Sequence, residues 1–120
     1  MGTMQIINGP IIPAGESLSD AVDCSAGRVV RITTPAQWDS DAPISFEVST
    51  DGNGFNPLYA DDGHLIQIPC GPARAILIAQ ENWWPGLFIK IRSGTPTGPM
   101  KQAQQREFAI ALYVEDVVTP

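Results

Sequence analysis

ISFEVSTDGNGFNPLY, residues 44–59, decides the fold of this chain. Apolar and polar side chains alternate over residues 44–49, and a turn rich in Asp, Gly and Asn follows them. Alternation with a period of two is typical of a half-buried strand, because successive side chains point to opposite faces. Asp, Gly and Asn adopt a positive φ at low steric cost. The stretch therefore predicts a strand, a reversal and a second strand.

The same turn has an alternative interpretation as a ligand loop. Asp51 and Asn53, with Asp61 or Asp62 from the next turn, carry oxygen atoms that could bind calcium. The stretch lacks the spacing and the terminal glutamate of a helix-loop-helix calcium site. Asp62-Gly63 between two alternating runs is itself a strong hairpin signal. We expect structural turns, with no metal and no cofactor, and leave a loop calcium ion or sugar as the alternative.

Alternating segments recur along the whole chain. The clearest after residues 44–49 is FAIALYV, residues 108–114, and the shorter ones are bounded by Gly, Pro, Asn or Asp. These shorter segments cover residues 4–12, 18–22, 28–33, 55–60, 64–68, 74–78 and 87–93. No long segment has helical spacing, and we expect a loop over residues 100–108 although they include good helix formers.

Eight or nine short strands at intervals of about ten residues predict an all-β antiparallel sandwich. The connections over residues 35–43 and 94–106 are long, which suits crossing between sheets and favours a jelly roll over an immunoglobulin-like fold. With 120 residues the chain is expected to form a single domain, residues 1–120. Residues 1–12 are apolar and interrupted by Pro, which predicts an extended N-terminal arm that lies on a neighbouring subunit.

Composition argues against several classes of partner. Acidic residues outnumber basic ones 13 to 7, so the field around the chain opposes nucleic-acid phosphates and anionic membranes. No apolar run is long enough to cross a bilayer, and MGTMQII lacks the basic start of a signal peptide. We therefore predict no nucleic acid partner, no membrane, and synthesis in the cytoplasm.

The residue types that carry catalysis are sparse. Cys24 and Cys70 have no CxxC spacing and His64 is the single histidine, so one chain cannot assemble a zinc site. The cysteines could be free thiols or a disulfide, and a reducing cytosol favours free thiols. His64 has no serine or cysteine motif to form a triad, and no GxSxG or phosphate loop occurs. We predict that the chain is not an enzyme and has no catalytic residues.

Tryptophans and an alternating basic pair are the candidates for contacts. Adjacent residues of an extended chain point oppositely, so one ring of Trp83-Trp84 is expected in the core and the other against solvent, a partner or a sugar. Lys90 and Arg92 share the strand face opposite the core. Five of the seven basic residues lie between residues 63 and 106, which could pair acidic and basic faces of two copies or simply be solvated. The predicted interface residues are Ile6, Ile7, Ile11, Ile12, Trp38, Trp83, Trp84, Lys90 and Arg92.

Several phrases together resemble the small structural proteins of tailed bacteriophages and prophages. They are IPAGESLSDAVDCSAGRVVRITTPAQW at residues 12–38, ISFEVSTDGNGFNPLYADDG at 44–63, FIKIRSGT at 88–95 and REFAIALYV at 106–114. The resemblance covers most of the chain. It implies a virion component on the capsid surface, a decoration or cement protein, often trimeric, whose partner is the major capsid protein. ISFEVSTDGNGFNPLY also resembles part of the discoidin-type jelly roll, which implies the alternative of a receptor- or carbohydrate-binding module on a head or tail fibre.

Overall fold

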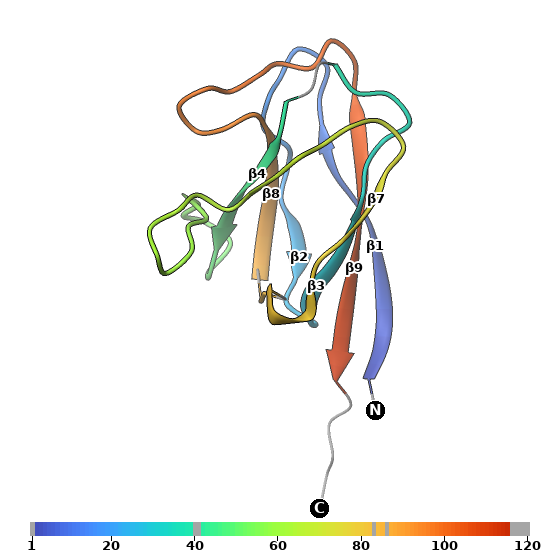
Figure 1. Ribbon diagram of the computed structural model, residues 1–120, viewed down its shortest axis with the longest axis vertical. Coiled ribbons are helices and arrows are strands. Elements are labelled where there is room, and N and C mark those ends of the chain that lie inside the picture. Colours follow the sequence, from blue (N-terminus) through green and yellow to red (C-terminus); the bar gives the residue numbers. More distant parts are fainter. Residues whose placement is uncertain (1, 40–41, 83, 86, 116–120) are drawn as a thin grey trace, which may run out of the picture.

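A computed structural model describes residues 2–39, 42–82, 84–85 and 87–115. Two antiparallel sheets pack face to face, which confirms the predicted all-β sandwich (Figure 1). The described strands are β1 (Gly2–Ile12), β2 (Val22–Cys24), β3 (Arg28–Thr33), β4 (Ile44–Ser49), β5 (Asn56–Pro57), β6 (Gln67–Ile68), β7 (Ala75–Leu77), β8 (Leu87–Ser93) and β9 (Arg106–Glu115), with one turn of 3₁₀ helix at Gln80–Asn82.

Each sheet interleaves strands from early and late parts of the sequence. One sheet has the order β1-β9-β3-β7, and the other has the order β2-β8-β4-β5, with β6 also paired to β4. The reversal predicted at residues 44–59 is confirmed, because β4 and β5 pair antiparallel through Glu47↔Pro57 and Val48↔Asn56. One edge of β4 pairs with β8. The other edge pairs with β6 and β5, one after the other along the strand.

The core lies between the two sheets and follows the period-two pattern of the sequence. In β8, Ile89 and Ile91 are fully buried, while Lys90 between them faces outward. Burying an aliphatic or aromatic side chain of this size contributes about 1.5–3 kcal/mol. Both sheets and two loops supply the buried cluster, which consists of Ile12, Cys24, Val29, Ile32, Trp38, Ile44, Phe46, Cys70, Ile89, Ile91, Phe108, Ile110 and Leu112.

Residues 18–22 are predicted as one strand, but the regular strand β2 begins only at Val22. Leu18 forms an isolated bridge to Arg92, and regular pairing with β8 begins only at Val22. The intervening backbone crosses between the sheets, because the Ser19 N–H donates to the Ile91 carbonyl at 2.9 Å and the Asp20 N–H donates to the Ile11 carbonyl at 3.1 Å. Residues 100–105 form a loop, as expected, and β9 begins at Arg106.

Residues 2–12 are a strand of their own sheet, not an arm on a neighbour. β1 pairs with β9 from Gly2↔Glu115 to Ile12↔Arg106, with an irregularity between Asn8 and Ile11. Proline is tolerated there because β1 is an edge strand. Ile12 is 0% exposed, and Ile7 packs on the core. The sandwich therefore uses this segment to complete its own interior, which corrects the sequence-based interpretation.

Candidate functional site

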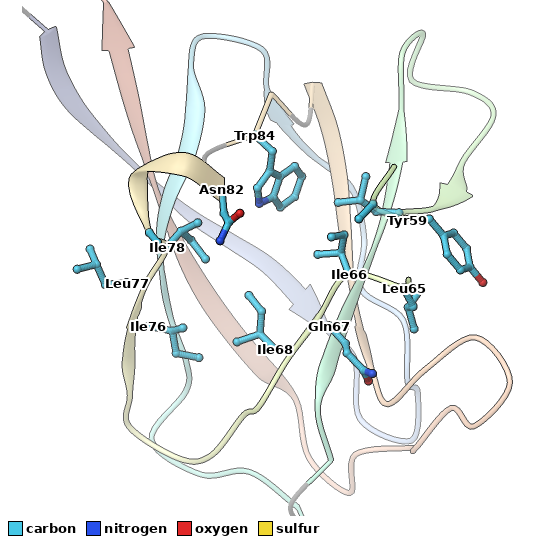
Figure 2. Close-up of a pocket in the computed structure, with 13 residues that line it drawn as sticks. Tyr59, Leu65, Ile66, Gln67, Ile68, Ile76, Leu77, Ile78, Asn82 and Trp84 are labelled. Atoms are coloured by element: carbon cyan, nitrogen blue, oxygen red, sulfur yellow. The ribbon is translucent and has the colours of Figure 1, made fainter. Parts of the chain in front are cut away.

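An apolar groove of about 630 Å³ opens between the edges of the two sheets (Figure 2). One wall is β7 with the 3₁₀ turn, and the other is formed by residues 58–68 along the edge of β4. The side chains that line it are mostly aliphatic or aromatic. The residues that surround it are Leu58, Tyr59, Ala60, Leu65, Ile66, Gln67, Ile68, Ile76, Leu77, Ile78, Ala79, Asn82 and Trp84.

Because side chains alternate along β7, Ile76 and Ile78, the residue that follows the strand, both point toward the groove. Ile76 and Ile78 are half-buried, whereas Leu77 is 77% exposed and points away from the groove (Figure 2). Trp84 stands at one end, with its ring edge-on to Phe46 at 5.2 Å between centroids. One of the two adjacent tryptophans is thus packed on the core, as expected. Trp83 lies outside the described residues.

A hairpin of residues 58–66 builds the opposite wall. The Leu58 N–H donates to the Phe46 carbonyl at 3.0 Å, which anchors the base of the hairpin to the edge of β4. The Ile66 N–H donates to the Leu58 carbonyl at 3.0 Å and closes its base. At the tip, Gly63 has φ 89°, a conformation that favours glycine. The Asp62 carboxylate accepts the His64 N–H at 2.9 Å, which lowers the pKa of Asp62. His64 is therefore a turn residue in an exposed position.

The backbone of β7 is open on the side away from β3. The Thr34 N–H donates to the Arg74 carbonyl at 2.7 Å, and the Ile78 N–H donates to the Val30 carbonyl at 2.9 Å. In an antiparallel pair these bonds fall on alternate residues, so the N–H and C=O groups of Ala75 and Leu77 point away from β3. Among the described strands, β7 has β3 as its only neighbour. An edge of this kind is a template for a further strand.

The groove offers little chemistry beyond apolar contact. Its polar side chains are the amides of Gln67 and Asn82 and the hydroxyl of Tyr59, which points outward (Figure 2). Among the residues that the structure describes, no carboxylate, histidine or cysteine lines it. Across the described ranges, no group of three His, Cys, Asp or Glu residues could hold a metal ion. The arrangement suits an apolar protein segment better than a polar ligand.

The turn after β4 uses its polar atoms internally. The Asp51 carboxylate accepts the Asn53 N–H at 2.8 Å, the Gly54 N–H at 3.1 Å and the Ser49 hydroxyl at 2.9 Å. These bonds, led by that from Asn53, lower the pKa of Asp51. Gly52 has φ 84°, a left-handed conformation that favours glycine because glycine has no Cβ atom to clash with the backbone. These local hydrogen bonds and the positive φ of Gly52 explain why Ser, Asp and Gly occur in the turn.

Lys90 and Arg92 lie on the outer face of their sheet, as predicted, but their charges are used within the chain. Arg92 forms an ion pair with Glu47 in which the two side chains are 11% and 14% exposed. The Lys90 ammonium lies 4.4 Å from the centroid of the Phe55 ring. The Arg92 guanidinium is therefore already paired within the chain, with Glu47 on the neighbouring strand β4.

Two other interface candidates belong to the interior. Trp38 is 8% exposed, packs edge-on against Phe108 at 5.6 Å and donates its indole N–H to the Ala42 carbonyl at 3.2 Å. Ile12 is fully buried. Neither can contact a partner while the sandwich is intact. Ile7 and Ile11 are half-buried in β1, and Ile6 is 51% exposed.

A buried polar cluster was not predicted. Arg106, 5% exposed, pairs with Asp39 at 2.6 Å and donates to the Gln102 amide oxygen at 3.0 Å. The Gln102 amide also donates to the Ser93 hydroxyl at 2.9 Å. These bonds fix the loop before β9 to β8 and to the segment after Trp38. Nothing in the local sequence pairs residues so far apart, so the cluster could be found only in the folded chain.

Both cysteines are free and buried, as expected for thiols kept in the reduced state. Burial raises the pKa of Cys24 to about 12 and that of Cys70 to about 11, because the thiolate loses its hydration. A thiol with a raised pKa is a poor nucleophile at neutral pH.

Within the described ranges, none of the helical structure has the length and apolarity needed to span a bilayer. Comparisons of the chain with protein-family models, with curated proteins and with solved structures give no match in any of the three.

Proposed function

We propose that this chain is a non-enzymatic structural protein of a phage particle, a capsid decoration protein that bridges subunits of the head. The resemblance in sequence to phage structural proteins suggests the class, and a small β-sandwich is a fold that such proteins use. In this role the partner is the major capsid protein and the location is the outer surface of the virion.

We also propose that the sandwich is a jelly roll. The orders β1-β9-β3-β7 and β2-β8-β4-β5 alternate early and late strands in both sheets. Two Greek-key connections produce this kind of alternation in jelly rolls. The fold would present its loops and sheet edges to neighbouring shell subunits.

The groove between β7 and residues 58–68 is the observation that carries the proposed docking role. It combines an apolar floor with an open strand edge, so an extended segment of a shell protein could add main-chain hydrogen bonds and bury side chains in alternate positions. Many copies of such a modest contact would stabilise a shell.

Capsid binding tests the proposal. Purified protein is expected to bind expanded capsids with a saturable stoichiometry that matches the lattice. Ile76→Lys, which places a charge in the groove, should weaken binding about tenfold or more, equivalent to about 1.4 kcal/mol. Met100→Lys, at a residue 41% exposed in a loop away from the groove, is the matched control and should bind normally.

The alternative function gives a different result in the same preparation. A receptor-binding module would bind host cells or glycans and leave capsids unoccupied. Binding of glycans without binding of capsids would replace the decoration role, and turnover of a substrate would replace both. The apolar lining of the groove makes a carbohydrate the less suitable ligand.

A further inference from the structure

The outer face of the sheet β1-β9-β3-β7 carries a row of side chains that crosses all four strands. The register pairs Ile6 with Ala111, Ala111 with Arg31, and Arg31 with Leu77. Directly paired residues point to the same face of a sheet. Leu77 points away from the groove (Figure 2), and Ile7, next to Ile6, packs on the core, so this row faces away from the sandwich.

This face concentrates the exposed large apolar side chains of the molecule. Met4 is 61% exposed, Ile6 is 51% exposed and Leu77 is 77% exposed. Met4 belongs to the neighbouring row, in which it pairs with Tyr113. In the described part of the chain, only Tyr59 and Met100 are comparable, and both lie in loops or turns. Met4 and Ile6 lie on the edge strand β1 and Leu77 lies on the opposite edge strand β7, so they form two apolar margins on either side of β9 and β3.

The centre of the face carries two small side chains of β9. β9 contributes Ala109, which is half-buried, and Ala111, which is 3% exposed between the larger side chains of β1 and β3, while Tyr113 lies on the same side of β9 nearer its end. Small residues at the middle of a sheet allow another sheet to pack at about 10 Å. The face therefore has small side chains near its centre and exposed apolar side chains at its two margins, β1 and β7.

Charges of both signs occur on this same face. Arg28 and Arg31 are exposed on β3, and Glu107 and Glu115 are exposed on β9 at positions that alternate with the buried Phe108, Ile110 and Leu112. A face that holds both signs can be complementary to a second copy of itself, because a two-fold axis parallel to the strands and midway between β9 and β3 would set the acidic residues of β9 in one copy over the basic residues of β3 in the other.

We propose that the outer face of this sheet binds a second copy of the chain, face to face, in a two-fold symmetric pair. Four strands about 4.8 Å apart and a rise of about 3.3 Å per residue give a sheet area of about 500 Å² per copy. A standard interface buries about 800 Å² per partner, so the pair is expected to be reversible and to depend on concentration.

Sedimentation velocity over a range of concentrations tests the pair. The full chain is expected to shift from monomer to dimer, and Leu77→Glu or Ile6→Glu should raise the dimer dissociation constant at least tenfold. Met100→Glu is the matched control, since Met100 is exposed but lies in a loop outside this sheet, and it should dimerise normally. Circular dichroism of each variant checks that the sandwich is retained.

A charge exchange distinguishes this face from any other contact. A variant with Arg28→Glu and Arg31→Glu should self-associate weakly, as should a variant with Glu107→Arg and Glu115→Arg. Mixed together, the two should form a heterodimer more tightly than either forms a homodimer. A monomer at every concentration, a trimer, a mixture with no preference for the heterodimer, or equal loss of dimer in Met100→Glu would each overturn the proposal.

Discussion

Arg92 and Glu47 lie nearly out of solvent on the outer face of the second sheet, and the Arg92 Nη1 has no hydrogen-bond partner in the described part of the molecule. An ion pair in this setting loses much of its hydration, so its net contribution to stability is small while both partners are present. Removing one partner has a much larger effect, because the other charge remains in a nearly dry place without compensation.

We expect Arg92→Met to lower the free energy of unfolding by about 3 kcal/mol, and the double variant with Glu47→Gln to recover a large part of that loss. Urea unfolding of the wild type, both single variants and the double variant measures the coupling. Equal stability of Arg92→Met and wild type would contradict the described ion pair.

The two thiols should be protected in the folded chain. Burial raises the pKa of Cys24 to about 12 and that of Cys70 to about 11, so the reactive thiolate is scarce at neutral pH. We expect a disulfide reagent at pH 8 to label both cysteines slowly in the native protein and at once in denaturant. Fast labelling of either cysteine in the native protein would show that its surroundings open readily.

At the scale of elements, the edge strand β1 is an integral part of the sandwich. It pairs with β9 over nearly its whole length and supplies Ile12 and Ile7 to the core. The apolar sequence of this segment predicts that it packs against another apolar surface. That surface is the core of its own sandwich. The segment's interruption at Pro10 predicts that the contact lies outside the domain, which the structure contradicts because an edge strand can accommodate a proline.

Deleting residues 1–12 should therefore abolish cooperative unfolding, since the deletion leaves a cavity at Ile12 and uncovers one side of β9. Thermal unfolding followed by circular dichroism measures this. Met4→Ser, which changes a residue 61% exposed in the same strand, is the control and should unfold nearly as the wild type does. A truncated chain that melts cooperatively at the wild-type temperature would restore the arm interpretation.

Regular strands could be predicted from the sequence, whereas the site between them could not. The bounds of β3, β4 and β8 follow directly from alternation, as does the reversal after Ser49. The groove depends on which two edges end side by side, and this is set by pairings between distant segments such as Arg31 and Leu77. Trp38 was misjudged for the same reason, because its burial comes from Phe108, far along the chain.

At the scale of the whole molecule, five groups give stability a definite dependence on pH. Local hydrogen bonds lower the pKa values of Asp23, Asp51 and Asp62 below 3.8, so their contribution is present above that pH and is lost as pH falls through the lowered values. The raised thiol pKa values act in the opposite direction. Their contribution is full below pH 9.0 and is lost as pH rises through about 11 and 12.

We expect the urea midpoint to change little through these groups between pH 3.8 and 9.0 and to fall on both sides of that range. Replacing both cysteines by alanine should reduce the alkaline fall, and Asp51→Ala should reduce the acid fall. A midpoint that keeps rising above pH 9.0 would contradict the burial of the thiols.

The outermost pair of the β1–β9 ladder, Gly2 with Glu115, has a practical use. Paired residues in an antiparallel ladder have Cα atoms about 4.5–5.5 Å apart, so the two ends of the described chain leave the sandwich together, as Figure 1 shows. A short linker could join them, and a new opening at the tip of the 58–66 hairpin would give a circular permutant. Cargo fused beside Gly2 or beside Glu115 would be displayed at the same end of the sandwich.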